Sequence, residues 1–201
     1  MKKSIVLALA LVAPAFGKGV ETVVPVTVVE TSAPALWAVE VGAGYHWAIN
    51  DIDDYNLEGV DTVGGDMTIL YNFTENLAAT VRFGWYAGEK DYNAWESMEA
   101  EYKSVTAGLR YTTEVAPGTR WYIGAEAGVG NYELTFSVLG DGEVSYDKTG
   151  FAYGVETGVQ YDVADGVYVY GAVEFSGCTA DPGGCKDQFG YGLRAGVGVS
   201  F

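Results

Sequence analysis

The sequence predicts an all-β fold, an eight-stranded antiparallel up-and-down transmembrane β-barrel. Three observations indicate it: segments in which every second residue is apolar, connections that alternate between short and long, and aromatic residues near both ends of the segments. Period-two alternation is the pattern of a β-strand with one apolar face. The composition agrees, with 28 Gly and 15 Tyr among 201 residues, because glycine suits tight turns and aromatic residues favour strands.

The alternation predicts eight strands in chain order, at 36–47, 63–73, 77–88, 102–113, 120–131, 149–162, 167–176 and 189–201. Three connections are tight turns rich in turn formers, at 74–76, 116–119 and 164–166. The other four are long and polar, and we expect loops at 48–62, 89–101, 132–148 and 177–188. Short turns on one side and long loops on the other are typical of a transmembrane barrel.

Every predicted strand has one face without charge in its central span. The apolar series of the first, third and last strands are Trp37-Val39-Val41-Ala43-Tyr45-Trp47, Leu77-Ala79-Val81-Phe83-Trp85-Ala87 and Tyr191-Leu193-Ala195-Val197-Val199-Phe201. The opposite faces carry charges among many glycines. A soluble barrel would turn the apolar faces inward, whereas a membrane barrel would turn them to lipid. Four tryptophans with several tyrosines and phenylalanines would overfill an eight-stranded interior, so we predict the membrane orientation.

Aromatic residues near the strand ends predict two interfacial girdles around an apolar band. The girdle residues that we single out are Trp37, Trp47, Trp85, Tyr111, Trp121 and Tyr153. Before the barrel, Lys2 and Lys3 precede the apolar run 5–12, and small residues follow. This pattern is typical of a cleaved secretory signal peptide, here 1–17.

The signal peptide, the eight strands, the girdles and the final aromatic residue resemble the small eight-stranded outer-membrane β-barrel family, which includes the OmpA-like transmembrane domain. The resemblance implies the bacterial outer membrane, with 18–35 as a periplasmic lead-in and 36–201 as the barrel domain. It also implies that Phe201, Val199 and Val197 form a signal for the barrel-assembly machinery. The implied partners are that machinery, outer-membrane lipid and lipopolysaccharide, and the barrel is expected to be a monomer.

OmpA-like barrels have a lumen that ion pairs plug, and parity places the same chemistry inside this one. The predicted lumen network consists of Glu40, Asp66, Arg82, Arg110, Glu126, Glu156, Glu174 and Arg194. Buried charges are costly unless they are paired, and neighbouring strands favour the pairs Arg194–Glu40 and Arg110–Glu126. A small ion-conducting pore is the alternative, but eight strands leave no open channel.

The expected loops carry most of the acidic residues, and the formal net charge is −16. This acidity argues against nucleic acid as a partner. Asp54 to Gly59 resembles the first half of a calcium loop, but the twelfth position is Gly65, and we predict no metal and no cofactor. Cys178 and Cys185 flank a turn-forming stretch and are predicted to form a disulfide in an exported protein.

Lipid A-modifying barrels are the enzymatic alternative. The deacylase type needs His and Ser two residues apart on a strand, but Ala48 follows His46 at that spacing. The palmitoyltransferase type is only vaguely matched by His46 with Glu96 and Ser97, so we predict no enzyme activity. The predicted function is a structural component of the envelope with a plugged lumen and acidic surface loops. The alternative of a surface adhesin or ligand-binding barrel stays open.

Overall fold

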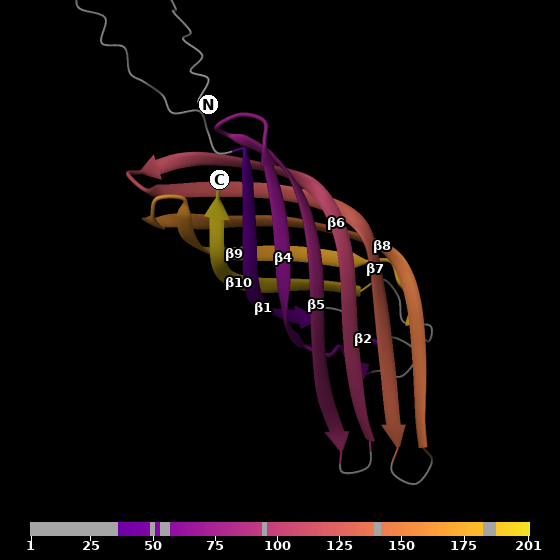
Figure 1. Ribbon diagram of the computed structural model, residues 1–201. Coiled ribbons are helices and arrows are strands. Elements are labelled where there is room, and N and C mark those ends of the chain that lie inside the picture. The colour runs from indigo at the N-terminus through magenta and orange to yellow at the C-terminus, as the bar shows by residue number, and fades with distance from the viewer. Residues whose placement is uncertain (1–35, 49–50, 53–56, 94–95, 139–141, 183–187) are drawn as a thin grey trace, which may run out of the picture. The chain divides into compact units, whose positions relative to one another are not determined.

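The structure is a computed structural model that describes residues 36–48, 51–52, 57–93, 96–138, 142–182 and 188–201 (Figure 1). The chain divides into two units, Met1–Pro34 and Ala35–Phe201, and only the second contains described residues. The predicted signal peptide and lead-in lie outside the described residues. Within the described ranges, no helix is long and apolar enough to cross a bilayer.

Eight antiparallel strands close into a barrel in the order β1-β10-β9-β8-β7-β6-β5-β4, which confirms the predicted fold (Figure 1). The barrel strands are β1 (Trp37–Ala48), β4 (Thr62–Asn72), β5 (Leu77–Asn93), β6 (Glu96–Ala116), β7 (Thr119–Val138), β8 (Gly142–Ala164), β9 (Val167–Cys178) and β10 (Gln188–Ser200). The last strand closes the ring on the first, with Val197 opposite Val41. Two short strands, β2 (Asp51–Ile52) and β3 (Leu57–Glu58), pair with each other in the first long connection.

The strand register fixes the width of the barrel. Following paired residues from His46 through Gly192 and around the ring leads to Asn72, whose amide donates to the carbonyl of Leu36. The path therefore returns to the first strand ten residues away from its start. With standard strand spacings, this stagger gives a tilt of about 41° and a backbone radius of about 8 Å. Such a lumen has room only for side chains.

Tight turns connect the strands at one end of the barrel. Gly118 and Gly166 occupy the β6–β7 and β8–β9 turns with φ angles of 69° and 71°, which glycine adopts without strain. This matches the turn chemistry that the sequence predicted at 116–119 and 164–166.

The faces of the barrel are oriented as a membrane barrel requires. Large apolar residues such as Val41, Leu109 and Val155 are 60%, 55% and 53% exposed on the outside. Charged residues line the inside, where Glu40 and Arg110 are fully buried. The soluble barrel with an apolar interior is therefore excluded.

Two of the four expected loops are wrong. β5 and β6 continue as paired strands through most of 89–101, and β7 and β8 do so through most of 132–148. The alternation of side chains continues there with inverted polarity, and the acidic residues give these strands the composition of a loop. In Figure 1 these four strands extend beyond the ends of β1, β4, β9 and β10.

Candidate functional sites: the lumen and the projecting sheet

The lumen contains all eight charged residues that parity placed there. Three arginines come from β5, β6 and β10, and five carboxylates come from β1, β4, β7, β8 and β9; they are Arg82, Arg110, Arg194, Glu40, Asp66, Glu126, Glu156 and Glu174. All but Glu126 are buried, and 12% of the Glu126 side chain is exposed. Burial of this many charges requires mutual pairing, because an isolated charge in a low-dielectric interior is strongly unfavourable.

Glu156 is the centre of this network, because its carboxylate contacts all three arginines. Its Oε2 lies 2.6 Å from Nη2 of Arg82 and 2.9 Å from Nη1 of Arg194. Its Oε1 lies 2.9 Å from Nη2 of Arg110. Arg82 and Arg194 are also joined through Glu174, whose Oε2 is 2.9 Å and 3.2 Å from their Nη1 atoms. One carboxylate thus connects three strands across the lumen.

Glu40 forms a second level of the network, nearer the short turns. Its Oε1 accepts hydrogen bonds from Arg110 at 2.6 Å, from Gln160 at 3.0 Å and from the Tyr168 hydroxyl at 3.0 Å. The Arg110 guanidinium also lies over the Tyr122 ring, 4.4 Å from its centroid. Charge-assisted hydrogen bonds and a cation–π contact therefore hold Arg110 in place.

The two ion pairs expected from neighbouring strands differ from those observed. Arg194 contacts Asp66, Glu156 and Glu174 instead of Glu40, and Glu126 contacts Arg82 instead of Arg110. The ladder explains the difference, since the strand neighbours of the arginines are small. Arg194 faces Gly44 and Ala172, and Arg110 faces Ala78 and Gly124, so both side chains extend across the lumen.

His46 lies near the end of β1 that is opposite the short turns, at the end of the lumen. Its ring packs edge-to-face with the Tyr86 ring, with 4.4 Å between the ring centroids. Its Nε2 is 3.8 Å from Oε1 of Glu174. Tyr86 in turn donates to Asp66 at 3.2 Å. His46 and Tyr86 also line a cavity of about 70 Å³, together with Tyr102 and Tyr132. His46 thus packs against the top of the charged network.

Both faces of β5 to β8 change polarity at one row of paired residues, Trp85, Lys103, Asn131 and Thr149. Below this row the outer face is apolar. Beyond it the outer face is polar, and the inner face is apolar except for Lys90, Glu96 and Lys148. The register of β6 with β7 is unbroken through the change, from Glu96↔Val138 to Glu114↔Arg120. We call the part beyond the row, residues 86–93, 96–102, 132–138 and 142–148, the projecting sheet.

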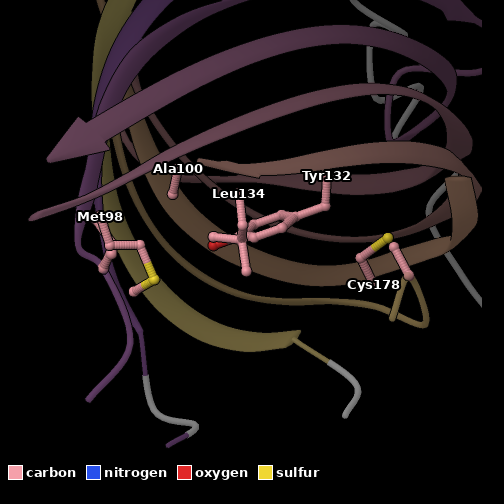
Figure 2. Close-up of a cluster of buried hydrophobic side chains, with 7 residues drawn as sticks. Met98, Ala100, Tyr132, Leu134 and Cys178 are labelled. Atoms are coloured by element: carbon pink, nitrogen blue, oxygen red, sulfur yellow. The ribbon is translucent and has the colours of Figure 1, made fainter. Parts of the chain in front are cut away.

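The concave face of the projecting sheet holds an apolar cluster (Figure 2). Met98, Leu134 and Tyr132 are 0%, 1% and 8% exposed, and they share the cluster with Val60, Ala100, Cys178 and Ala180. Val60 and Ala180 come from the connections β3–β4 and β9–β10, so the cluster ties the projecting sheet to the neighbouring connections. The sequence signal for this sheet is the continued alternation of Tyr132, Leu134 and Phe136, whose apolar side chains stand on the face that is polar within the barrel.

The convex face of the projecting sheet is acidic. Glu101 stands directly opposite Glu133, and Glu133 opposite Asp147. Lys103 pairs with Glu101 at 2.9 Å. Hydrogen bonds from Trp85 Nε1 and Lys103 Nζ hold the pKa of the Glu101 carboxyl below its usual value. The Glu101 carboxyl is therefore ionised at neutral pH, beside Trp85 of the aromatic girdle.

The other predicted site residues occupy the following places. The girdle residues Trp37, Tyr111 and Trp121 point outward near the short turns, and Trp47, Trp85 and Tyr153 lie towards the opposite end. Val197, Val199 and Phe201 are exposed on the outer face, where Phe201 is 69% exposed.

The cysteine and calcium predictions fall partly outside the described residues. Cys178 is buried in the apolar cluster at 2% exposure, and Cys185 lies outside the described part of the chain, so the disulfide stays a prediction. The first residues of the calcium-like stretch, 54–56, are likewise not described. Within the described ranges, no group of three or more His, Cys, Asp or Glu side chains suits a metal ion.

Comparison with known proteins agrees with this geometry. The family described as "Outer membrane protein beta-barrel domain" matches residues 22–201. The comparison with curated proteins found no similar sequence.

Several solved structures share the fold. Neisserial surface protein A is 17% identical with a TM-score of 0.63, and the match covers 85% of this chain and 100% of that one. Ail, the attachment invasion locus protein of Yersinia pestis, solved with the heparin analogue sucrose octasulfate, is 21% identical with a TM-score of 0.56, covering 82% and 99%. A major outer membrane protein from Thermus thermophilus is 10% identical with a TM-score of 0.55, covering 82% and 99%.

Proposed function

Because the chain belongs to the family of outer membrane protein β-barrel domains, we propose that it is a non-enzymatic envelope component whose own side chains close the lumen. The observation that carries this proposal is the Glu156 carboxylate, bound to three guanidinium groups in a lumen of about 8 Å backbone radius. A continuous water path for ions would require these bonds to break. Buried, mutually paired charges resist this because each unpaired group would be strongly destabilised.

Conductance across planar bilayers tests the closed lumen. The folded protein is expected to give no steady conductance above that of the bare membrane. A matched pair of variants provides controls. Glu126→Gln changes the most accessible member of the network and should stay closed, whereas Arg82→Gly with Arg194→Gly removes two guanidinium groups and should open a pathway. A steady conductance of the unmodified barrel would overturn the proposal.

A second function, binding of a partner at the cell surface, is favoured by the projecting sheet. Barrels of this kind place short turns in the periplasm and long connections outside, so the sheet faces the exterior. Its concave cluster fixes it to the barrel, which makes it a rigid platform rather than a flexible loop. Two structures with the same fold are named a surface protein and an attachment protein, which agrees with this role.

Shortening the sheet tests the surface role. Deleting residues 134–146 and joining Glu133 to Asp147 through Asn-Gly keeps the register, because these two residues face each other. Cells that produce this variant are expected to lose adhesion to cultured host cells. Replacing Pro117 with Asn, in a short turn of the opposite end, is the control and should leave binding unchanged. Equal binding by both variants would contradict the surface role.

A further inference from the structure

The strand β8 has one free edge in the projecting sheet. Residues 142–150 pair with β7, from Val138↔Gly142 to Gly130↔Gly150. On its other side, β8 meets β9 only from Ala152 onward, after Phe151 exchanges hydrogen bonds with Thr179. Residues 143–149 therefore have no strand on that side among the described residues, and all of them are exposed.

A free edge presents backbone donors and acceptors to which another strand can be added. Proteins commonly block such edges with proline, bulges or inward-pointing charges. The segment 142–150 contains no proline, and its register with β7 has no bulge. Its one inward-pointing charge is Lys148, which stands opposite Tyr132 at the end of the edge nearest the barrel. An acidic residue in the added strand would pair with Lys148, so the edge is open to strand addition over about six residues.

The side chains along this edge are already held in place by β7. Ser145 donates to Glu133 at 3.0 Å, and Asp147 accepts a hydrogen bond from Asn131. Tyr146 packs edge-on against Phe136 with 6.2 Å between ring centroids. A partner would therefore meet a largely preformed surface, which lowers the entropic cost of binding.

The two faces of the edge set the chemistry of the partner. On the convex face, Glu143 and Asp147 extend the acidic surface that Glu133 begins. On the concave face, Val144 and Tyr146 are 52% and 37% exposed. An added strand would place alternate residues against these two faces, because side chains alternate along a strand.

We infer that the β8 edge over 143–149 binds an extended basic segment of another protein by strand addition. Basic side chains would stand opposite Glu143 and Asp147, and apolar side chains opposite Val144 and Tyr146. A second copy of this chain suits the edge less well. Antiparallel pairing of two such edges about Tyr146 would set Thr149 opposite Glu143 and Ser145 opposite Asp147, leaving both acids without a cation. The inference rests on the proposed surface-binding function.

A designed peptide tests the inference directly. Its core, from N- to C-terminus, is glutamate, lysine, tyrosine, threonine, valine and lysine, which matches residues 148 to 143 in antiparallel order. A second peptide carries glutamate in place of both lysines. Binding of the labelled peptides to the folded barrel in lipid nanodiscs is followed by fluorescence anisotropy. The unmodified barrel is expected to prefer the basic peptide by about tenfold, since opposite and like charges across strands differ by about this amount for two pairs.

Charge-reversal variants separate strand addition from general attraction to an acidic protein. Glu143→Lys with Asp147→Lys should reverse the preference toward the acidic peptide. Glu89→Lys with Glu99→Lys changes the same number of charges on the same convex face, away from β8, and should keep the original preference. Equal loss in both double variants, or no preference in the unmodified barrel, would overturn the inference. If sedimentation shows dimers that the peptide does not dissociate, the edge binds a second copy of this chain instead.

The outcome also distinguishes this inference from the function on which it rests. If shortening the sheet abolishes cell binding but neither peptide is preferred, the surface role stands and the β8 edge is not the site. If shortening has no effect on cell binding, the surface role itself fails, whatever the peptides show.

Discussion

Replacement of Glu156 with Gln is expected to destabilise the barrel more than the same replacement at Glu126. The substitution conserves size but removes the charge that three guanidinium groups share at 2.6 Å, 2.9 Å and 2.9 Å. The Gln amide nitrogen is a hydrogen-bond donor, so part of the new side chain would face guanidinium donors. All four residues are buried, so water cannot readily replace the lost bonds.

The size of the effect follows from the neighbours that stay in place. Arg82 and Arg194 keep Glu174, and Arg110 keeps Glu40, so no guanidinium is left wholly without a carboxylate. Breaking a buried pair costs about 3–5 kcal/mol when it leaves a charge unpaired, and because every guanidinium here keeps one carboxylate, we expect the loss in unfolding free energy at the lower end of that range, about 3 kcal/mol. The matched control is Glu126→Gln, which removes one bond of 2.8 Å at a partly exposed carboxylate. Its expected cost is about 1–2 kcal/mol.

Urea unfolding in lipid vesicles, followed by heat-dependent migration on gels, measures both variants. A folded barrel has no free edge within the membrane and migrates differently from the boiled protein. Glu156→Gln should unfold at clearly lower urea than Glu126→Gln. If the two variants lose the same free energy, or if Glu156→Gln loses less than about 1 kcal/mol, Glu156 is not the centre of the network.

Three further predictions concern other parts of the chain. Leu134→Ala should cost about 2–5 kcal/mol locally, exposing the projecting sheet to protease while the barrel keeps its heat-dependent migration. Gly42→Val should lower the folded fraction, because a β-carbon there would overlap the Tyr170 hydroxyl, whereas Gly171→Val, with its nearest neighbour at 3.9 Å, should fold normally in the same gel assay. Phe201→Ser should reduce the amount of folded protein in isolated outer membranes, and an unchanged amount would contradict its assembly role.

The strand positions and the facing of their side chains could be predicted from the sequence. A strand with one apolar face can be placed in a barrel in only two ways, with that face turned into the lumen or out of it. Once volume excluded an apolar interior, the facing of residues such as Glu40 and Arg194 followed. The ion pairs could not be predicted in the same way. They depend on the stagger of ten residues around the ring, which brings Arg194 across the lumen to Asp66 and Glu156. Stagger is a property of the closed ring and is not visible in any one strand.

The strands of the projecting sheet could not be predicted from the sequence, for a different reason. In 97–102 and 132–138, polar and apolar residues alternate as strictly as they do in the barrel. The rule that an outward face is apolar holds only while lipid surrounds it. Beyond the row of Trp85 and Lys103, water lies outside, and the apolar side chains turn inward to Val60 and Ala180. The strand is continuous; only the solvent changes.

The energetics of the projecting sheet bear on the meaning of its acidity. The opposed carboxylates of Glu101, Glu133 and Asp147 cost roughly 0.2–1 kcal/mol for each facing pair. Burial of Met98 and Leu134 on the other face contributes about 1.5–3 kcal/mol each, which outweighs that cost. The cluster therefore allows the sheet to be acidic, but it does not require it to be so. Polar uncharged residues on the convex face would avoid the repulsion between facing carboxylates, whereas the acids suit the basic partner that we infer for the neighbouring β8 edge.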